Sequence, residues 1–202
     1  MHLLIVIDHY NPASFSHAVA ARFADGARAA GHTVEIADLR AEEFDPRWQA
    51  GDDRDYGDAD RPADVQAEQA RVDRADAFCL VFPLWWWGMP STMKGWIDRV
   101  FCWGWAYDQL DDPTPAGSML PVRPCVLLVP AGASPQSMAE EGFDTALHTQ
   151  IVAGTLGFFG MAAELHVLHG TLGKPERREA HLQTAYRLGH AIAAAGPKAG
   201  AS

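Results

Sequence analysis

The sequence has few cysteines, no long apolar run and no excess of positive charge. Its three cysteines, Cys79, Cys102 and Cys125, lie far apart in apolar contexts, which fits neither a metal site nor a disulfide framework. We therefore expect reduced core residues in a cytoplasmic protein, because a free cysteine behaves as a small apolar side chain. The nine histidines show no metal-ligand spacing with cysteines or acids, so we expect no metal site.

The lack of long apolar runs and of positive charge disfavours membrane insertion and nucleic-acid binding. No stretch approaches the roughly 20 apolar residues of a membrane-spanning helix. The N-terminus lacks the basic region and the longer apolar run of a signal sequence. The formal net charge is −10, whereas binding to a phosphate backbone needs a basic face. We expect neither a nucleic-acid partner nor insertion into a membrane.

What the sequence does contain is an alternation of strand and helix patterns. Short, continuously apolar runs predict buried strands at residues 3–7, 33–36, 77–82, 126–129 and 163–167. Helices are predicted between and after them, at residues 15–27, 63–73, 91–101, 144–157 and 175–194. This alternation predicts an α/β fold whose parallel sheet carries helices on both faces. We expect one domain over residues 1–194 and a flexible tail at 195–202.

Three loops are expected to meet where such a fold binds ligands, beyond the carboxyl ends of the strands. They are residues 9–16, 83–88 and 130–137. The first lacks the Gly-x-Gly-x-x-Gly pattern and the P-loop lysine, which disfavours a direct dinucleotide-binding domain or an ATPase. It ends in Ser14 and Ser16 at a predicted helix start, where backbone N–H groups bind phosphate. Plain helix capping by Ser14 explains the same pattern.

The second loop carries three consecutive tryptophans within FPLWWWGMP, residues 82–90. Neighbours on an extended chain face opposite sides, so all three cannot enter one core. Aromatics exposed in a loop indicate a planar ligand or another subunit, and the flat apolar face of an isoalloxazine ring suits them; plugging a core is the alternative. The third loop has small side chains at Ala131 and Gly132, which let its amides approach a ring edge.

A run of motifs in a fixed order extends this interpretation. They are AEQ at 67–69, AD at 75–76, FPLWWWGMP at 82–90, KGWIDRVF at 94–101 and AY at 106–107. From its first strand to about Gly160, the chain resembles the flavodoxin-like NAD(P)H:quinone oxidoreductases. That family includes DT-diaphorase, the bacterial drug-activity modulators and flavoproteins ancillary to potassium efflux. The resemblance implies a flavodoxin-like fold with a five-stranded parallel sheet and helices on both faces.

The resemblance also implies roles for individual residues. The implied flavin-binding residues are His9, Ser14, Phe15, Ser16, Gln69, Pro83, Leu84, Trp85, Trp86, Trp87, Ala131 and Gly132. Trp103, Trp105 and Tyr107 correspond to a substrate-binding segment that reaches the partner subunit's active site, which implies a homodimer. Because His9 and Gln69 are present, we expect FAD, with FMN as the alternative and NAD(P)H as co-substrate.

One region departs from the family. Members similar to DT-diaphorase carry a tyrosine after the Ser-Met of the third loop and a histidine further on. Here Ala139 follows Ser137 and Met138, and the nearest histidine is His148. The candidate catalytic residues are therefore Tyr107, as a donor near the acceptor, and His148, although a histidine there is also typical of a helix surface.

The function implied is a flavin-dependent NAD(P)H dehydrogenase (quinone). It would transfer a hydride from NAD(P)H through the flavin to a quinone or similar acceptor, in two-electron, ping-pong steps. Two other functions stay open at this point. One is an electron-transfer flavodoxin, and the other is a redox-sensing regulatory subunit in peripheral association with a membrane transporter.

Overall fold

The computed structural model describes residues 1–52, 61–107, 118–173 and 175–193. Five parallel strands form one sheet in the order β2-β1-β3-β4-β5. They are β1 (His2–Ile7), β2 (Thr33–Asp38), β3 (Ala77–Val81), β4 (Arg123–Pro130) and β5 (Met161–Leu168). The predicted α/β fold is confirmed. Its strand order is that of doubly wound flavodoxin-like sheets, which bind ligands where the order reverses.

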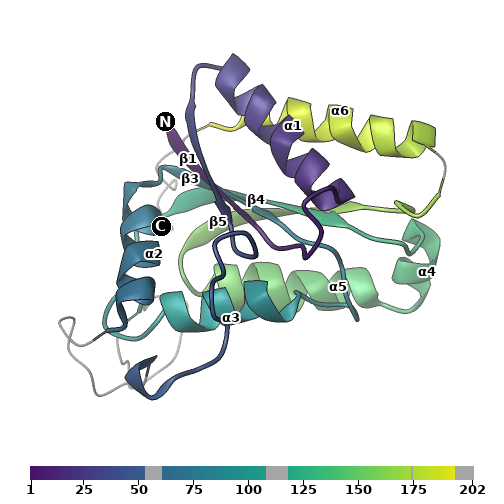
Figure 1. The fold of residues 1–202 in the computed structure, drawn as a ribbon. Coiled ribbons are helices and arrows are strands. Elements are labelled where there is room, and N and C mark those ends of the chain that lie inside the picture. Colours follow the sequence, from purple (N-terminus) through teal and green to yellow (C-terminus); the bar gives the residue numbers. More distant parts are fainter. Residues whose placement is uncertain (53–60, 108–117, 174, 194–202) are drawn as a thin grey trace, which may run out of the picture.

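Helices cover both faces of the sheet (Figure 1). On one face lie α1 (Phe15–Ala29) and α6 (Pro175–Ala191). On the other lie α2 (Ala63–Arg74), α3 (Ser91–Val100), α5 (Phe143–Leu147) and the π-helical segment η4 (His148–Leu156). The short helices α4 (Pro135–Glu140) and η1 (Ala50–Asp52) complete the described elements.

The strand pattern divides the interior into two cores. Successive side chains of a strand point to opposite faces, so in β1 Leu3 and Ile5 join the core beneath α1 and α6. Leu4 and Val6 join the core beneath α3, with Trp96. Every residue of β3 is buried, as expected for a parallel strand between two helical layers.

Several boundaries differ from those predicted. The strands β4 and β5 extend further on both sides than their apolar runs, because pairing with a neighbour carries the extended backbone beyond them. The segment predicted as a loop to residue 137 already contains the start of α4 at Pro135. The predicted helix 144–157 consists of α5 followed by η4.

Two further predictions are not settled by this architecture. The single domain over 1–194 stays a prediction. The flexible tail at 195–202 lies outside the described residues.

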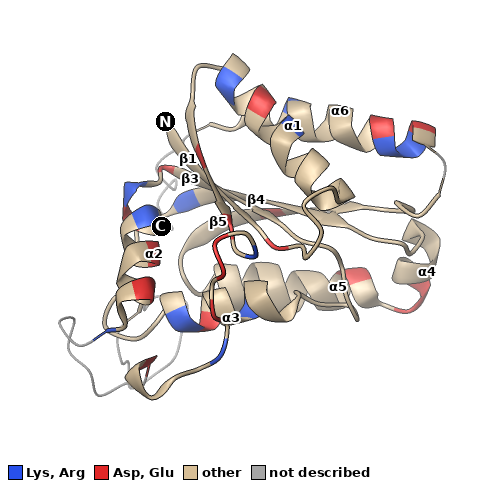
Figure 2. Cartoon of the chain, viewed as in Figure 1, with Lys and Arg blue, Asp and Glu red and all other residues tan. Residues whose placement is uncertain are grey.

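Charged residues of both signs occur on the outer helices α2, α3 and α6 (Figure 2). None of the helices in the described part of the chain is long and apolar enough to cross a bilayer.

Candidate cofactor site

A cavity of about 410 Å³ lies where the loops after β1, β3 and β4 meet. Those are the three loops that the sequence predicts at the carboxyl edge of the sheet. The residues that line it are His9, Asn11, Ala13, Ser14, Phe15, Ser16, Pro83, Leu84, Trp85, Pro130, Gly132, Thr171, Leu172 and Arg178. Eight of the residues predicted to bind flavin therefore lie around one hollow: His9, Ser14, Phe15, Ser16, Pro83, Leu84, Trp85 and Gly132.

The start of α1 forms the polar wall of this cavity. Ser14 is the N-cap residue of α1, and its Oγ accepts a hydrogen bond from the backbone N–H of His17 at 3.3 Å. Within the described residues, the N–H groups of Phe15 and Ser16 have no hydrogen-bond acceptor. Unpaired N–H groups at the positive end of a helix dipole make a site for an anion such as phosphate.

The tryptophan loop is a tight turn and not the extended segment that the sequence argument assumed. Trp85 and Gly88 exchange backbone hydrogen bonds of 3.2 and 3.1 Å. Between them, Trp86 and Trp87 have φ of 48° and 61°, which is the left-handed region of a two-residue type I′ turn. Bulky residues rarely adopt this conformation. The three indoles point in different directions because the backbone reverses in this turn, and not because side chains alternate along an extended strand.

Each tryptophan of the turn has a different environment. Trp85 lines the cavity, and its ring centroid lies 5.9 Å from that of His9 and 6.3 Å from that of Tyr10. Trp87 stacks on Phe143 at the start of α5, with ring centroids 3.7 Å apart. Trp86 is 96% exposed. Only Trp85 of the three therefore lines the cavity, while Trp87 anchors the turn and Trp86 projects into solvent.

The loop after β4 presents small residues and backbone donors. Ala131 is buried and held in place, because its N–H donates to Leu168 O and its carbonyl accepts from Thr171. Within the described part of the chain, the amides of Gly132 and Ala133 have no acceptor. A Cβ atom at Gly132 would lie 2.9 Å from Leu172 Cδ1, so a larger residue would crowd this wall. Ala131 supports the cavity from behind while Gly132 lines it.

A fourth segment, which the sequence argument did not include among the loops, completes the cavity. Thr171 and Leu172 follow β5, and Arg178 belongs to the first turns of α6. The guanidinium carbon of Arg178 lies 4.9 Å from the centroid of Phe15. The rule that located the other loops also applies to the one after β5, because parallel strands all end at one edge.

Asp8 connects the ends of β1 and β3, from which two of these loops start, with α3 and Arg40. Its carboxylate is buried, accepts the N–H of Met93 in α3 at 2.8 Å, and accepts the Nε–H of Arg40 at 2.9 Å. Its own backbone N–H donates to Val81 at the end of β3. His9, the next residue, accepts the N–H of Asn11 on Nδ1. Burial lowers the pKa of His9, and the nearby His17 lowers it further.

Besides Trp86 and Trp87, the predicted residues Gln69 and His148 also lie away from the cavity. Gln69 is buried, and its Nε2 donates to Val100 O at 2.9 Å and to Cys102 Sγ at 3.3 Å. Its amide therefore joins α2 to the end of α3, because a buried amide needs partners. His148 is an exposed residue at the start of η4 and lines none of the described cavities.

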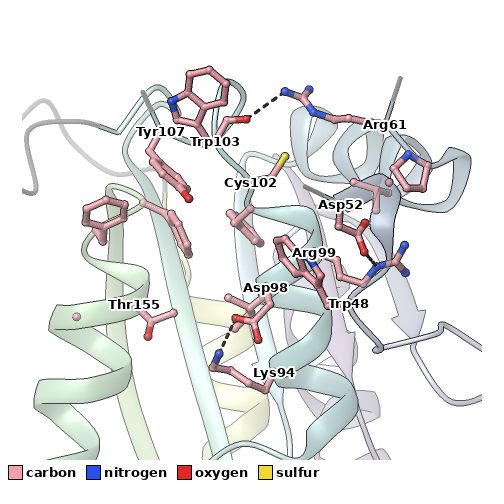
Figure 3. Close-up of a pocket in the computed structure, with 18 residues that line it drawn as sticks. Trp48, Asp52, Arg61, Lys94, Asp98, Arg99, Cys102, Trp103, Tyr107 and Thr155 are labelled. Atoms are coloured by element: carbon pink, nitrogen blue, oxygen red, sulfur yellow. Dashed lines mark hydrogen bonds and ion pairs between the residues drawn. The ribbon is translucent and has the colours of Figure 1, made fainter. Parts of the chain in front are cut away.

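Two of the three predicted substrate-binding residues, Trp103 and Tyr107, lie in a second, larger cavity of about 500 Å³ (Figure 3). Trp103 and Tyr107 line it beside Phe158 and Phe159, and the hydroxyl of Tyr107 points into the space. Trp105 packs instead against the core, 5.9 Å from Phe101 between ring centroids. The smaller cavity is the better candidate for a cofactor site, because within the described residues the strand-end loops meet a free helix N-terminus there.

With this geometry established, similarity to known proteins is informative. A family model described as the flavodoxin-like fold matches residues 1–189. The chain belongs to this family. An NAD(P)H oxidoreductase of Haemophilus influenzae, named as uncharacterized, is 29% identical to this flavodoxin-like protein over 162 residues. That match covers 80% of this chain and 79% of the relative.

Two further similarities point the same way. An NAD(P)H:quinone oxidoreductase from Methanothermobacter marburgensis superposes with a TM-score of 0.85 at 29% identity, covering 95% of this chain and 98% of that one. A ribosyldihydronicotinamide dehydrogenase (quinone) of Pongo abelii is 32% identical over 123 residues, 52% of this flavodoxin-like chain. The match spans about half of that relative's length, 53%. The resemblance drawn from the sequence is confirmed, and these relatives support an oxidoreductase.

Proposed function

We propose that this protein is a flavin-dependent NAD(P)H:quinone oxidoreductase that binds FAD in the cavity beside α1. The observation that carries the proposal is the meeting of three strand-end loops at one hollow with complementary walls. One wall has unpaired amides at a helix N-terminus, another has the Trp85 ring, and a third has the free amides of Gly132 and Ala133. When bound, a flavin accepts a hydride from NAD(P)H and passes it to an acceptor.

The residues of the cavity suit the parts of a flavin one by one. Ser14, Phe15 and Ser16 would hold its phosphate, because hydroxyl and backbone N–H donors converge there. The Trp85 ring would pack along the isoalloxazine, as aromatic rings do on planar ligands. The amides of Gly132 and Ala133 would stabilise negative charge that develops at the ring edge, as donors in an oxyanion hole do.

FAD is proposed over FMN because the polar lining continues beyond the helix start. His9 and Arg178 line the same cavity as the Ser14–Ser16 segment. A guanidinium can pair with a diphosphate through several N–H groups. Gln69, the other residue that favoured FAD in the sequence, does not contribute to this cavity within one chain.

We also propose that the protein works as a homodimer in which the larger cavity contributes to the acceptor site. In a single chain, Tyr107 and Trp103 line a different cavity from the proposed flavin site. The indole Nε1 of Trp103 is buried without an acceptor in the described residues. In a dimer, Trp103 and Tyr107 of one chain would lie beside the proposed flavin site of the other. Light scattering on a size-exclusion column measures the mass, and a monomer at working concentrations would contradict this arrangement.

Cys79 and Cys125 are buried free thiols, as the sequence predicts, whereas Cys102 is only partly buried and is not a core residue. Free thiols are usual where the compartment is reducing. This supports a cytoplasmic location, which we include in the proposal.

The decisive test is an absorption spectrum of the purified protein, repeated after anaerobic addition of NADPH and then of a quinone. We expect flavin bands that bleach with NADPH and return with the quinone; chromatography of the released cofactor then distinguishes FAD from FMN. Flavin that stays oxidised with both NADH and NADPH would indicate an electron-transfer or regulatory flavoprotein instead.

A variant pair links that spectrum to the cavity. Trp85→Ala removes the aromatic wall and should weaken flavin binding roughly tenfold. Trp48→Ala is the matched control, because Trp48 is an exposed tryptophan of the larger cavity. Equal loss of flavin affinity in both variants would place the cofactor elsewhere.

A further inference from the structure

Three hydrogen-bonded side chains lead away from the polar wall of the cavity at the start of α1. Ser14 Oγ lies 2.8 Å from His17 Nδ1, and His17 Nε2 lies 2.9 Å from Asp38 Oδ2. Ser14 lines the cavity, whereas the side chains of His17 and Asp38 lie behind it, 19% and 22% exposed. Plain capping of α1 by Ser14 needs neither the imidazole nor the carboxylate.

The Asp38 end of this chain fixes where the imidazole carries a proton. Asp38 Oδ1 accepts the backbone N–H groups of Arg40 and Ala41, both at 3.2 Å, which leaves Oδ2 to face His17. An ionised carboxylate has only acceptors. His17 Nε2 must therefore carry a hydrogen whether the ring is neutral or charged, and Nδ1 is the nitrogen that gains or loses a proton.

The state of Nδ1 decides what the Ser14 hydroxyl can do. When His17 is neutral, Nδ1 is an acceptor, so the Ser14 O–H donates to it and has no hydrogen left for a ligand. When His17 is protonated, Nδ1–H donates to Ser14 Oγ. The hydroxyl then points its own hydrogen into the cavity, and a positive charge stands behind it.

We propose that His17 is a positioning residue that links binding of the flavin phosphate to uptake of one proton. This inference rests on the proposed function, because the phosphate in question is that of the flavin. The proton comes from solvent, adds to Nδ1, and no covalent bond between heavy atoms changes. An anion held by the Ser14 hydroxyl stabilises the protonated ring, and the protonated ring in turn orients the hydroxyl toward the anion.

Other titratable and charged groups lie around His17. Asp38 faces His17 from the end of β2. His9 faces it from the loop after β1, with ring centroids 6.4 Å apart. Asp8 and Arg40 pair with each other at 2.9 Å. Arg178 lines the same cavity and keeps its charge throughout the neutral range.

The sign of the pH dependence follows from linkage. If bound flavin raises the pKa of His17, affinity is highest below the pKa of the free protein and falls as pH rises through that of the complex. FAD is the suitable probe, because its diphosphate lacks the second ionisation near pH 6 that a monoester has. Riboflavin, which lacks phosphate, serves as the ligand control.

The test is titration of the flavin-free protein with FAD and with riboflavin between pH 5.5 and 8.5, followed by fluorescence. We expect the dissociation constant of FAD to rise roughly tenfold across this range, as for one unit of pKa shift on binding. Riboflavin affinity should stay constant. His17→Gln should remove most of the dependence for FAD, because a glutamine cannot take up the proton; the remainder would come from His9, which lines the same cavity.

Asp38→Asn provides the sharper variant. The backbone amides of Arg40 and Ala41 require the oxygen of the new side chain, so its NH₂ must donate to His17 Nε2. The neutral ring then carries its hydrogen on Nδ1 and donates to Ser14 at every pH. We expect an FAD affinity that varies much less with pH than that of the original protein and is tighter at pH 8.5. If the variant bound FAD more tightly only because one negative charge is gone, its FAD affinity would still fall with pH as steeply as that of the original protein.

An NMR titration of His17 gives a readout that does not depend on turnover. His17→Gln identifies its signal, whose pKa should rise when FAD binds and should not change with riboflavin. An unchanged pKa, or a full pH dependence of FAD binding in His17→Gln, would overturn the inference and leave the flavin site intact. If no flavin binds at any pH, the proposed function and this inference fail together.

Discussion

Arg99 shows at the scale of one residue how the segment before α2 is held. It is buried in α3, and its guanidinium donates to Asp52 Oδ2 at 2.7 Å, to Asp64 at 2.6 Å and to the carbonyl of Asp45 at 2.7 Å. Asp52 is also buried, and its Oδ1 already has no partner in the described residues. The partners of that carboxylate are therefore the arginine, which carries the compensating charge, and the backbone N–H of Gln49, which donates to Oδ2 at 2.7 Å.

Replacing Arg99 by methionine should lower the free energy of unfolding by about 3–5 kcal/mol, because it leaves a buried carboxylate without its positively charged partner. Urea denaturation followed by circular dichroism measures the change. Asp98→Ala is the control one position away. The Asp98–Lys94 pair is about half exposed, so its loss should cost about 0.5 kcal/mol or less. Equal losses in the two variants would contradict this role of Arg99.

Single residues also differ in how far the sequence predicts them. Ser14, Trp85 and Gly132 were predictable, because each follows a recognisable strand and parallel strands end at one edge. The position of Gln69 was not, because its amide pairs with Val100, 31 residues away in the chain. The left-handed turn at Trp86 could not be predicted from the sequence either, since tryptophan has no preference for that conformation.

At the scale of elements, the close contact of α1 with α6 supports the cavity. The two helices lie side by side on one face of the sheet (Figure 1). A Cβ atom at Gly189 would lie 2.1 Å from Phe23 O, and one at Gly26 would lie 2.0 Å from Tyr186 O. Only glycine allows this approach. The start of α6 then places Arg178 over Phe15 at the cavity.

Gly189→Ala should therefore push α6 away from α1. We expect a net loss of about 1–2 kcal/mol in unfolding free energy, because overpacking against backbone outweighs the gain in helix propensity. Flavin affinity should fall as well, since Arg178 moves with the helix. Gly88→Ala is the control for stability, because nothing lies within 4 Å of a Cβ there. Unchanged stability in Gly189→Ala would show that the helices separate at no cost.

Elements differ in how much of them the sequence shows. The helices α2 and α3 and the buried run of β1 appear in the sequence almost to the residue, because apolar spacing defines them. The short helix α4 was missed inside a segment that reads as loop. Its signal was a serine cap at Ser134 followed by Pro135 at the first helical position. The change from α5 to the π-helical η4 leaves no mark in apolar spacing.

At the scale of the whole molecule, the sheet separates two cores that each contain a cysteine. Cys79 of β3 belongs to the core beneath α1 and α6, and Cys125 of β4 belongs to the core beneath α3. Burial raises the pKa of Cys79 well above its usual value and raises that of Cys125 to about 12. Cys102, after α3, is partly exposed.

Alkylation of the native protein with iodoacetamide at pH 8 should therefore modify Cys102 first. Cys79 and Cys125 should react only as fast as the molecule unfolds, because the thiolate is the reactive form and both thiols are protonated and covered. Peptide mass mapping over time measures the three rates. Rapid modification of Cys125 together with Cys102 would show that the core beneath α3 opens without global unfolding.

The buried carboxylate of Asp8 has a consequence for the thermodynamics of association. Because it connects the ends of β1 and β3 with Arg40 and with the start of α3, the loops after these two strands start from fixed points before any ligand arrives. A ligand then has little loop entropy to remove, so its binding should be driven by enthalpy, with backbone order parameters in these loops that hardly change on saturation.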